Sequence, residues 1–107
     1  MQLSVTGKQL DVGDALRHHA ETNLAASVAK YFDGAIEGNI VFSREAHLFR
    51  ADISVHVGRG ILCQGSGEAV DPYPAFDMAL EHAVKQLRRH KRKLRDHHRL
   101  NYLPEQD

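Results

Sequence analysis

Apolar residues in this chain recur with two different periods, and the change of period predicts where strands give way to helices. Alternation of apolar and polar residues predicts a short strand over residues 1–6, and a β-branched and aromatic run predicts a second over 36–43. Every second residue from Phe49 to Val57 is apolar and the residues between them are polar. This third strand should therefore bury one face and expose the other.

A hairpin and a fourth strand should follow. Gly58-Arg59-Gly60 is typical of a tight turn, and the alternation resumes over residues 61–67. Gly65 and Gly67 weaken this strand because glycine provides no side chain to pack. They favour a bulge in the strand or a position at the edge of the sheet.

A four-residue period predicts the first helix, which begins at Asp14 after a loop over residues 8–13. Gly13 is an acceptable N-cap, and Asp14 lies at the positive end of the helix dipole. We expect Asp33-Gly34 to end the helix. The apolar stripe consists of Leu16, Ala20, Leu24 and Val28, followed by Tyr31 and Phe32.

The second helix should begin after Asp71 as N-cap, with Pro72 at the first helical position, where its missing N–H costs least. At about 100° per residue, its apolar residues fall within roughly 140°, and its basic residues centre about 150° away. The apolar side consists of Phe76, Ala79, Leu80, Ala83, Val84, Leu87 and Leu94. The opposite side is cationic.

The order β-α-β-β-β-α predicts an α+β fold, a two-layer sandwich with two helices on one face of a four-stranded sheet. The first helix would cross over between two parallel strands, and the other strands would form a meander. Double-stranded RNA-binding domains have the same layer plan. A length of 107 residues is that of one domain. We place it at residues 1–99, with 100–107 as a tail or the start of a linker.

The formal net charge is zero, but the charges are segregated along the chain. Residues 1–84 contain 6 Lys and Arg against 11 Asp and Glu, whereas residues 85–99 contain 8 basic residues against Asp96 alone. Ordinary solvated helix faces mix the two signs, and here only Glu81–Lys85 and Arg92–Asp96 offer i,i+4 pairs. Crowded like charges favour a polyanionic partner over the alternative of a merely solvated face.

The predicted nucleic-acid surface follows from this segregation. Arg and Lys contacts to phosphates position a protein without reading sequence, and the helix lacks an obvious set of base-reading Asn or Gln residues. Contact with about five phosphates would give a log–log salt dependence of about −3.5 to −4.5. RNA and DNA both stay open on this basis, and the layer plan favours duplex RNA. The basic residues of this surface are Lys85, Arg88, Arg89, Lys91, Arg92, Lys93 and Arg95.

No other group of residues indicates chemistry. His90 lies two helical turns from His97 and His98, too far for one metal ion without a third element between them. Cys63 falls in the fourth strand, which indicates a small buried or edge residue rather than a nucleophile. Nucleophile-elbow, P-loop and paired-carboxylate motifs are absent. We therefore expect no catalytic residue, no metal, no cofactor and no small-molecule substrate.

Composition limits where the protein works. The chain is 42% apolar and 26% charged, as in ordinary globular proteins. No apolar run approaches the ~20 residues of a membrane-spanning helix, and residues 1–5 lack the features of a secretion signal. The single cysteine excludes an internal disulfide. We expect a cytoplasmic protein without a membrane partner.

Several segments carry a family resemblance. The most specific is Glu68-Ala69-Val70-Asp71-Pro72-Tyr73-Pro74-Ala75-Phe76-Asp77, followed by the basic stretch 86–94. With residues 1–7, 14–17 and 30–33, these segments resemble the bacterial ribosome hibernation-promoting factors, also described as ribosome-associated inhibitors or sigma-54 modulation proteins. The resemblance covers about residues 1–99.

The resemblance implies a domain that docks on the small ribosomal subunit, in the channel where messenger RNA and the A- and P-site transfer RNAs lie. Such a domain inhibits translation by occlusion in stationary phase or starvation, and it catalyses nothing. It implies contact between the basic residues of the second helix and ribosomal RNA. Asp71, Tyr73 and Asp77 match the helix-entry motif, and two roles stay open for them: RNA contact, or a structural role in which Asp71 caps and Tyr73 packs.

Some features depart from the family pattern. Pro72 and Pro74 stand where the family usually has other residues, which stiffens the helix entry. Longer members add a C-terminal domain that pairs two ribosomes, so this chain corresponds to a short form or to the N-terminal domain of a long form. We expect dimerisation only through such a missing domain. Two other interpretations are a general double-stranded RNA-binding module and a protein-interaction module.

Overall fold

The computed structural model describes residues 1–58 and 60–101, with side chains in the last helix described up to residue 95. Its elements follow the predicted order: β1 (Gln2–Lys8), α1 (Asp14–Ala29), β2 (Glu37–Glu45), β3 (Leu48–Gly58), β4 (Ile61–Ala69) and α2 (Pro72–Asn101). Arg59 of the predicted turn, the predicted tail beyond residue 101 and the side chains of Asp96, His97, His98 and Arg99 lie outside the described residues.

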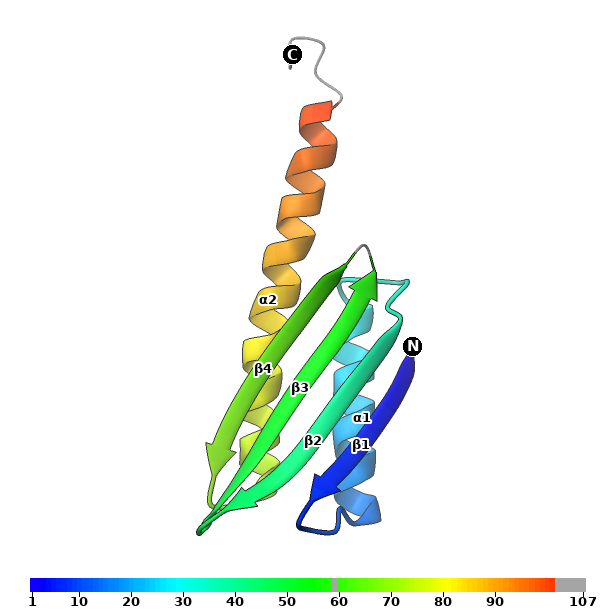
Figure 1. Ribbon diagram of the computed structural model, residues 1–107. Helices are drawn as coiled ribbons and strands as arrows, with labels where there is room; N and C mark the ends of the chain where they lie inside the picture. Colours follow the sequence, from blue (N-terminus) through cyan, green and yellow to red (C-terminus); the bar gives the residue numbers. More distant parts are fainter. Residues whose placement is uncertain (59, 102–107) are drawn as a thin grey trace.

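The strands form one sheet in the order β1-β2-β3-β4, with both helices on the same face (Figure 1). β1 pairs with β2 in parallel, because α1 returns the chain to the end of the sheet from which β1 starts. The β2–β3 and β3–β4 pairs are antiparallel. The predicted two-layer sandwich is confirmed. The C-terminal part of α2 projects beyond the sheet (Figure 1).

The first helix is shorter than predicted. α1 ends at Ala29 rather than at Asp33-Gly34. The N–H groups of Tyr31 and Phe32 both donate to the carbonyl of Val28, at 3.0 and 2.9 Å, which satisfies one terminal carbonyl and closes the last turn. Tyr31 and Phe32 still pack against the core. The apolar stripe therefore continued past the end of the helix and misplaced the predicted boundary.

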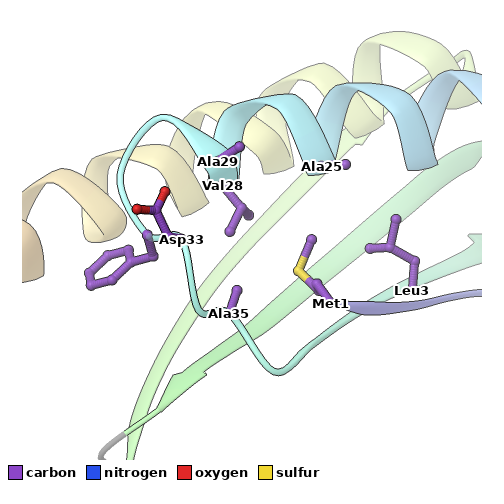
Figure 2. Close-up of a pocket in the computed structure, with 8 residues that line it drawn as sticks. Met1, Leu3, Ala25, Val28, Ala29, Asp33 and Ala35 are labelled. Carbon is purple, nitrogen blue, oxygen red and sulfur yellow. The ribbon is translucent and has the colours of Figure 1, made fainter.

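Beyond this helix end, a mostly apolar hollow of about 240 Å³ separates α1 from β1 (Figure 2). Its lining residues are Met1, Leu3, Ala25, Val28, Ala29, Phe32, Asp33 and Ala35. Asp33 supplies the one charged side chain of this lining. No lining side chain is basic.

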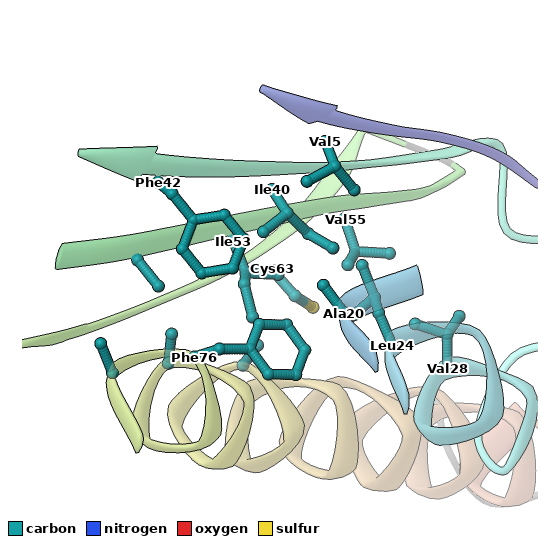
Figure 3. Packing of buried hydrophobic residues seen from close by; sticks show 14 of the residues in the cluster. Val5, Ala20, Leu24, Val28, Ile40, Phe42, Ile53, Val55, Cys63 and Phe76 are labelled. Atoms are coloured by element: carbon teal, nitrogen blue, oxygen red, sulfur yellow. The ribbon is translucent and has the colours of Figure 1, made fainter. Parts of the chain in front are cut away.

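The core lies between the sheet and the two helices (Figure 3). The rings of Phe42 from β2 and Phe76 from α2 lie 6.3 Å apart between centroids, near its centre. Cys63 is fully buried in β4, as predicted, and burial raises the pKa of its thiol. The thiol therefore stays protonated and acts as a small apolar group.

Gly65 and Gly67 lie in β4 at the sheet edge, as predicted, but they serve close helix packing rather than a bulge. A Cβ on Gly65 would collide with the backbone at Ala79 and Ala83, and one on Gly67 with the carbonyl of Ala75. These glycines let α2 lie directly on the strand. The irregular pairing expected in β4 is instead in β3, between His56 and Gly58.

Candidate nucleic-acid interface

The start of α2 is fixed by a side-chain cap. The carboxylate of Asp71 accepts a hydrogen bond from the N–H of Tyr73 at 2.9 Å, and α2 begins at Pro72 as expected. Asp71 therefore has the capping role, one of the two roles considered for the helix-entry motif. Capping sets where the helix starts and so fixes which later residues face the sheet.

Tyr73 and Asp77, the other two motif residues, contact α1 through His19. The rings of Tyr73 and His19 meet edge to face with centroids 5.0 Å apart. Nε2 of His19 lies 3.3 Å from a carboxylate oxygen of Asp77. The motif thus joins the N-terminal parts of the two helices, at the opposite end of α2 from the basic residues.

Two polar side chains of α2 bind the exposed backbone edge of β4. The N–H of Gln64 donates to Oε1 of Gln86 at 2.7 Å, and Nδ1 of His82 donates to the carbonyl of Ser66 at 2.7 Å. They satisfy backbone groups that an uncovered edge strand would leave open. Together with fully buried Leu87, they fix the rotation of α2 about its axis.

The seven predicted RNA-binding residues, Lys85 to Arg95 on α2, are all exposed. Among the described side chains, Arg50 and Asp52 form an ion pair and His19 contacts Asp77 at 3.3 Å, and neither contact includes a basic residue of α2. Glu81 and Lys85, spaced for an i,i+4 pair, form no ion pair, and the side chain of Asp96, spaced to pair with Arg92, lies outside the described residues. The cations are presented to solvent on one helix.

The basic residues of α2 line two surface hollows. Lys85, Arg88, Arg89 and Arg92 line one of about 250 Å³ on α2 alone. The second, of about 320 Å³, lies where the end of α1 meets α2, and we call it the seam hollow. It is lined by Lys30, Tyr31, Arg88, Lys91, Arg92 and Arg95.

Lys30 and Tyr31 were not among the predicted site residues. Their sequence neighbourhood indicated only the end of a helix, because their own segment carries no charge cluster. They join the basic residues of α2 only because the two helices lie side by side on the sheet (Figure 1). The sequence signal that could have identified them is a lysine at the end of one helix together with a basic run in the other.

The open face of the sheet carries a charged cluster of a different kind. Nε and Nη2 of Arg50 donate to the Asp52 carboxylate at 3.0 and 3.1 Å, and the Ser66 hydroxyl donates to it at 2.7 Å. Burial alone would raise the pKa of Asp52, but these hydrogen bonds together with the charges of Arg50 and Lys8 outweigh burial and lower it. Asp52 in turn raises the pKa of Arg50. This cluster satisfies its own charges.

Within residues 1–58 and 60–95, no three His, Cys, Asp or Glu side chains come together as metal ligands. Neither helix, over its described residues, combines the length and apolar character needed to cross a bilayer. The solvent-facing cations of α2 are the feature with the clearest chemical preference, which is for anionic groups.

Comparison with protein families gives a match over most of the chain. The family described as Sigma 54 modulation protein / S30EA ribosomal protein matches residues 3–95. A ribosome hibernation promotion factor from Rhizobium meliloti (strain 1021) is 39% identical over 101 residues, which cover 94% of this chain and 53% of the relative. A ribosome hibernation promoting factor from Salmonella typhimurium is 33% identical over 97 residues, 91% of this chain and all of that relative.

Solved structures agree with these sequence matches. The crystal structure of the Protein Y N-terminal domain from Thermus thermophilus superposes with a TM-score of 0.74 at 31% identity, covering 83% of this chain and 98% of that one. The chain spans about half the length of the rhizobial relative and the whole of the Salmonella one. The shared part includes both helices and the sheet.

Proposed function

The chain belongs to the Sigma 54 modulation protein / S30EA ribosomal protein family, and from this premise we propose that it is a ribosome hibernation factor. It binds the small ribosomal subunit in the messenger and transfer RNA channel and inhibits translation in stationary phase or stress. The observation that carries the proposal is the row of exposed cations on α2, none of which pairs with a carboxylate among the described side chains.

We assign contact with ribosomal RNA to the exposed basic residues of α2. Ribosomal RNA offers a fixed array of phosphates, and exposed Arg and Lys bind such arrays by displacing counterions. The repulsion among the α2 cations falls when phosphates lie between them. The assigned residues are Lys85, Arg88, Arg89, Lys91, Arg92, Lys93 and Arg95.

Inhibition in this proposal is occlusion. A rigid domain held in the channel excludes messenger and transfer RNA, so no bond is made or broken and no cofactor or small-molecule substrate is needed. The ribosome-binding unit is residues 1–99, and it acts in the cytoplasm, where ribosomes are found. Pairing of two ribosomes, which the family resemblance assigns to a further C-terminal domain, is not assigned to these residues.

Charge reversal on α2 tests the proposal. Arg88→Glu, Arg89→Glu and Arg92→Glu together should abolish co-sedimentation with the small subunit, while circular dichroism and thermal unfolding stay close to those of the wild type. Wild-type binding should be competed by messenger and transfer RNA. Its log–log salt slope should be about −3.5 to −4.5, corresponding to about five phosphates.

A matched pair of double variants controls for net charge. R88E/R92E and K8E/R44E change the charge equally, but Lys8 and Arg44 are exposed on β1 and β2 and line neither hollow of α2. Only R88E/R92E should weaken binding strongly. Unchanged binding in the triple variant would refute the assigned surface. Equal affinity for any duplex RNA would favour a general double-stranded RNA-binding module, and no RNA binding at all would favour a protein-interaction module.

A further inference from the structure

The geometry points to a more specific use of the seam hollow: we propose that it holds one unpaired RNA nucleotide, with its phosphate among the cations and its base against Tyr31. This deepens the proposed function and rests on it. The hollow combines basic side chains from both helices with an aromatic ring. Cations over the backbone and an aromatic platform under the base are how proteins bind single-stranded nucleic acid.

The two hollows on α2 differ in chemistry although they share Arg88 and Arg92. The hollow on α2 alone is lined only by Arg and Lys, which suits phosphates in any RNA. The seam hollow adds Tyr31, and its volume of about 320 Å³ has room for one nucleotide. In a duplex the base faces are stacked inside the helix, so Tyr31 could not reach one. The aromatic lining therefore favours an unpaired nucleotide.

Local contacts restrict Tyr31 and Lys91 before any ligand binds. The N–H of Tyr31 donates to the carbonyl of Val28 at 3.0 Å, so its backbone is fixed by the last turn of α1. Nζ of Lys91 lies 5.6 Å from the ring centroid of Phe32, within range of a cation–π attraction. Lys30, the C-cap residue of α1, also lines the hollow. A site that is formed in advance loses less entropy on binding.

The test distinguishes the contribution of the base to binding from that of the phosphates. Fluorescence anisotropy would compare an adenosine oligonucleotide of about eight residues with an abasic ribose-phosphate chain of the same length, a length within the usual single-stranded site size. The proteins would be the wild type, Tyr31→Phe and Tyr31→Leu. Tyr73→Leu is the matched control, because Tyr73 is also partly exposed but lies at the other end of α2. Thermal unfolding of every variant checks that it is folded.

We expect the wild type to bind the adenosine chain at least about fivefold more tightly than the abasic chain, as one stacked base predicts. Tyr31→Phe and Tyr73→Leu should keep this preference, and folded Tyr31→Leu should lose it while keeping its affinity for the abasic chain. Equal wild-type affinity for both chains, or a preference that survives in Tyr31→Leu, would overturn the inference.

Ribosome sedimentation of the same proteins distinguishes this inference from the proposed function. Tyr31→Leu should bind the small subunit about fivefold or more weakly than the wild type, a smaller loss than that of R88E/R89E/R92E. If it binds as the wild type does while the triple variant fails, the hollow proposal is wrong and the proposed function stands. If wild-type protein binds no ribosome, the proposed function is wrong, and the oligonucleotide comparison alone decides the chemistry of the hollow.

Discussion

The two parts of α2 have opposite relations to the rest of the molecule. In the packed stretch, Pro72–Val84, Ala75, Phe76, Ala79 and Ala83 are fully buried. In the basic stretch, Lys85–Arg95, Leu87 is the one fully buried residue and every cation is exposed. One continuous helix therefore anchors itself with one part and presents charge with the other. Stability and binding should respond to substitutions in different parts of the same helix.

Burial explains why the packed stretch anchors the helix. Small side chains on α2 meet glycines on β4, so the helix backbone comes close to the strand and Phe76 reaches the core beside Phe42. The basic stretch gains little from burial, and its like charges repel one another. An anionic ligand between these side chains would offset the repulsion.

The largest effect should come from the packed stretch. Phe76→Ala should lower the free energy of unfolding by about 3–5 kcal/mol, because it leaves a cavity in the core beside Phe42. Lys93→Ala, an exposed change in the basic stretch, should shift it by less than about 0.5 kcal/mol. Urea unfolding monitored by circular dichroism measures both. Similar values for the two variants would mean that the helix is not divided as described.

The next largest effect should come from the close packing of α2 on β4. Gly65→Ala should destabilise the fold by about 1–3 kcal/mol, because its Cβ collides with the backbone at Ala79 and Ala83. Gly34→Ala is the matched control, since no atom lies within 4 Å of the added Cβ and its φ lies outside the left-handed region. The measurement is the midpoint of urea unfolding. A Gly65→Ala variant as stable as Gly34→Ala would show that α2 does not need this close approach.

The smallest effect should come from charges that the fold already pairs, in contrast to those of the basic stretch. Asp52 has a lowered pKa, so the folded state favours its ionised form. This stabilises the fold at pH values above the ordinary pKa of a carboxyl group. At pH 7, Asp52→Asn should cost less than about 1 kcal/mol, because the side chain is partly exposed. The difference from wild type should shrink as the pH falls below about 4. A difference that is independent of pH would exclude the ionised carboxylate as its cause.

The sequence was informative about the candidate site because the site lies on one helix. Segregated charge and helical periodicity placed Arg88, Arg89 and Arg92 on the side of α2 opposite the core, and the structure exposes all three. The sequence predicted Asp71 as the N-cap of α2, and the hydrogen bond that its carboxylate accepts from the Tyr73 N–H confirms this. RNA contact by the basic residues stays a prediction, because no bound RNA tests it.

The sequence predictions were wrong or incomplete where the local structure depended on residues distant in the sequence. Tyr31 and Phe32 prolonged an apolar stripe past the end of α1, because packing on the core needs apolar residues whether or not the backbone is helical. Gly65 and Gly67 indicated a weak strand in the sequence. In the structure, glycine is needed at both positions because the backbone of α2 lies directly against β4.

The sequence by itself determined the order of the elements, the layer plan and the cationic side of α2. Hydrophobic periodicity and charge clustering are local patterns, visible among residues a few positions apart. Tertiary structure alone decided that Gln86 and His82 bind the edge of β4, and that Lys30 and Tyr31 lie beside Arg88 and Arg92. Those contacts join residues more than 15 positions apart, and only the packing of both helices on one sheet brings them within reach.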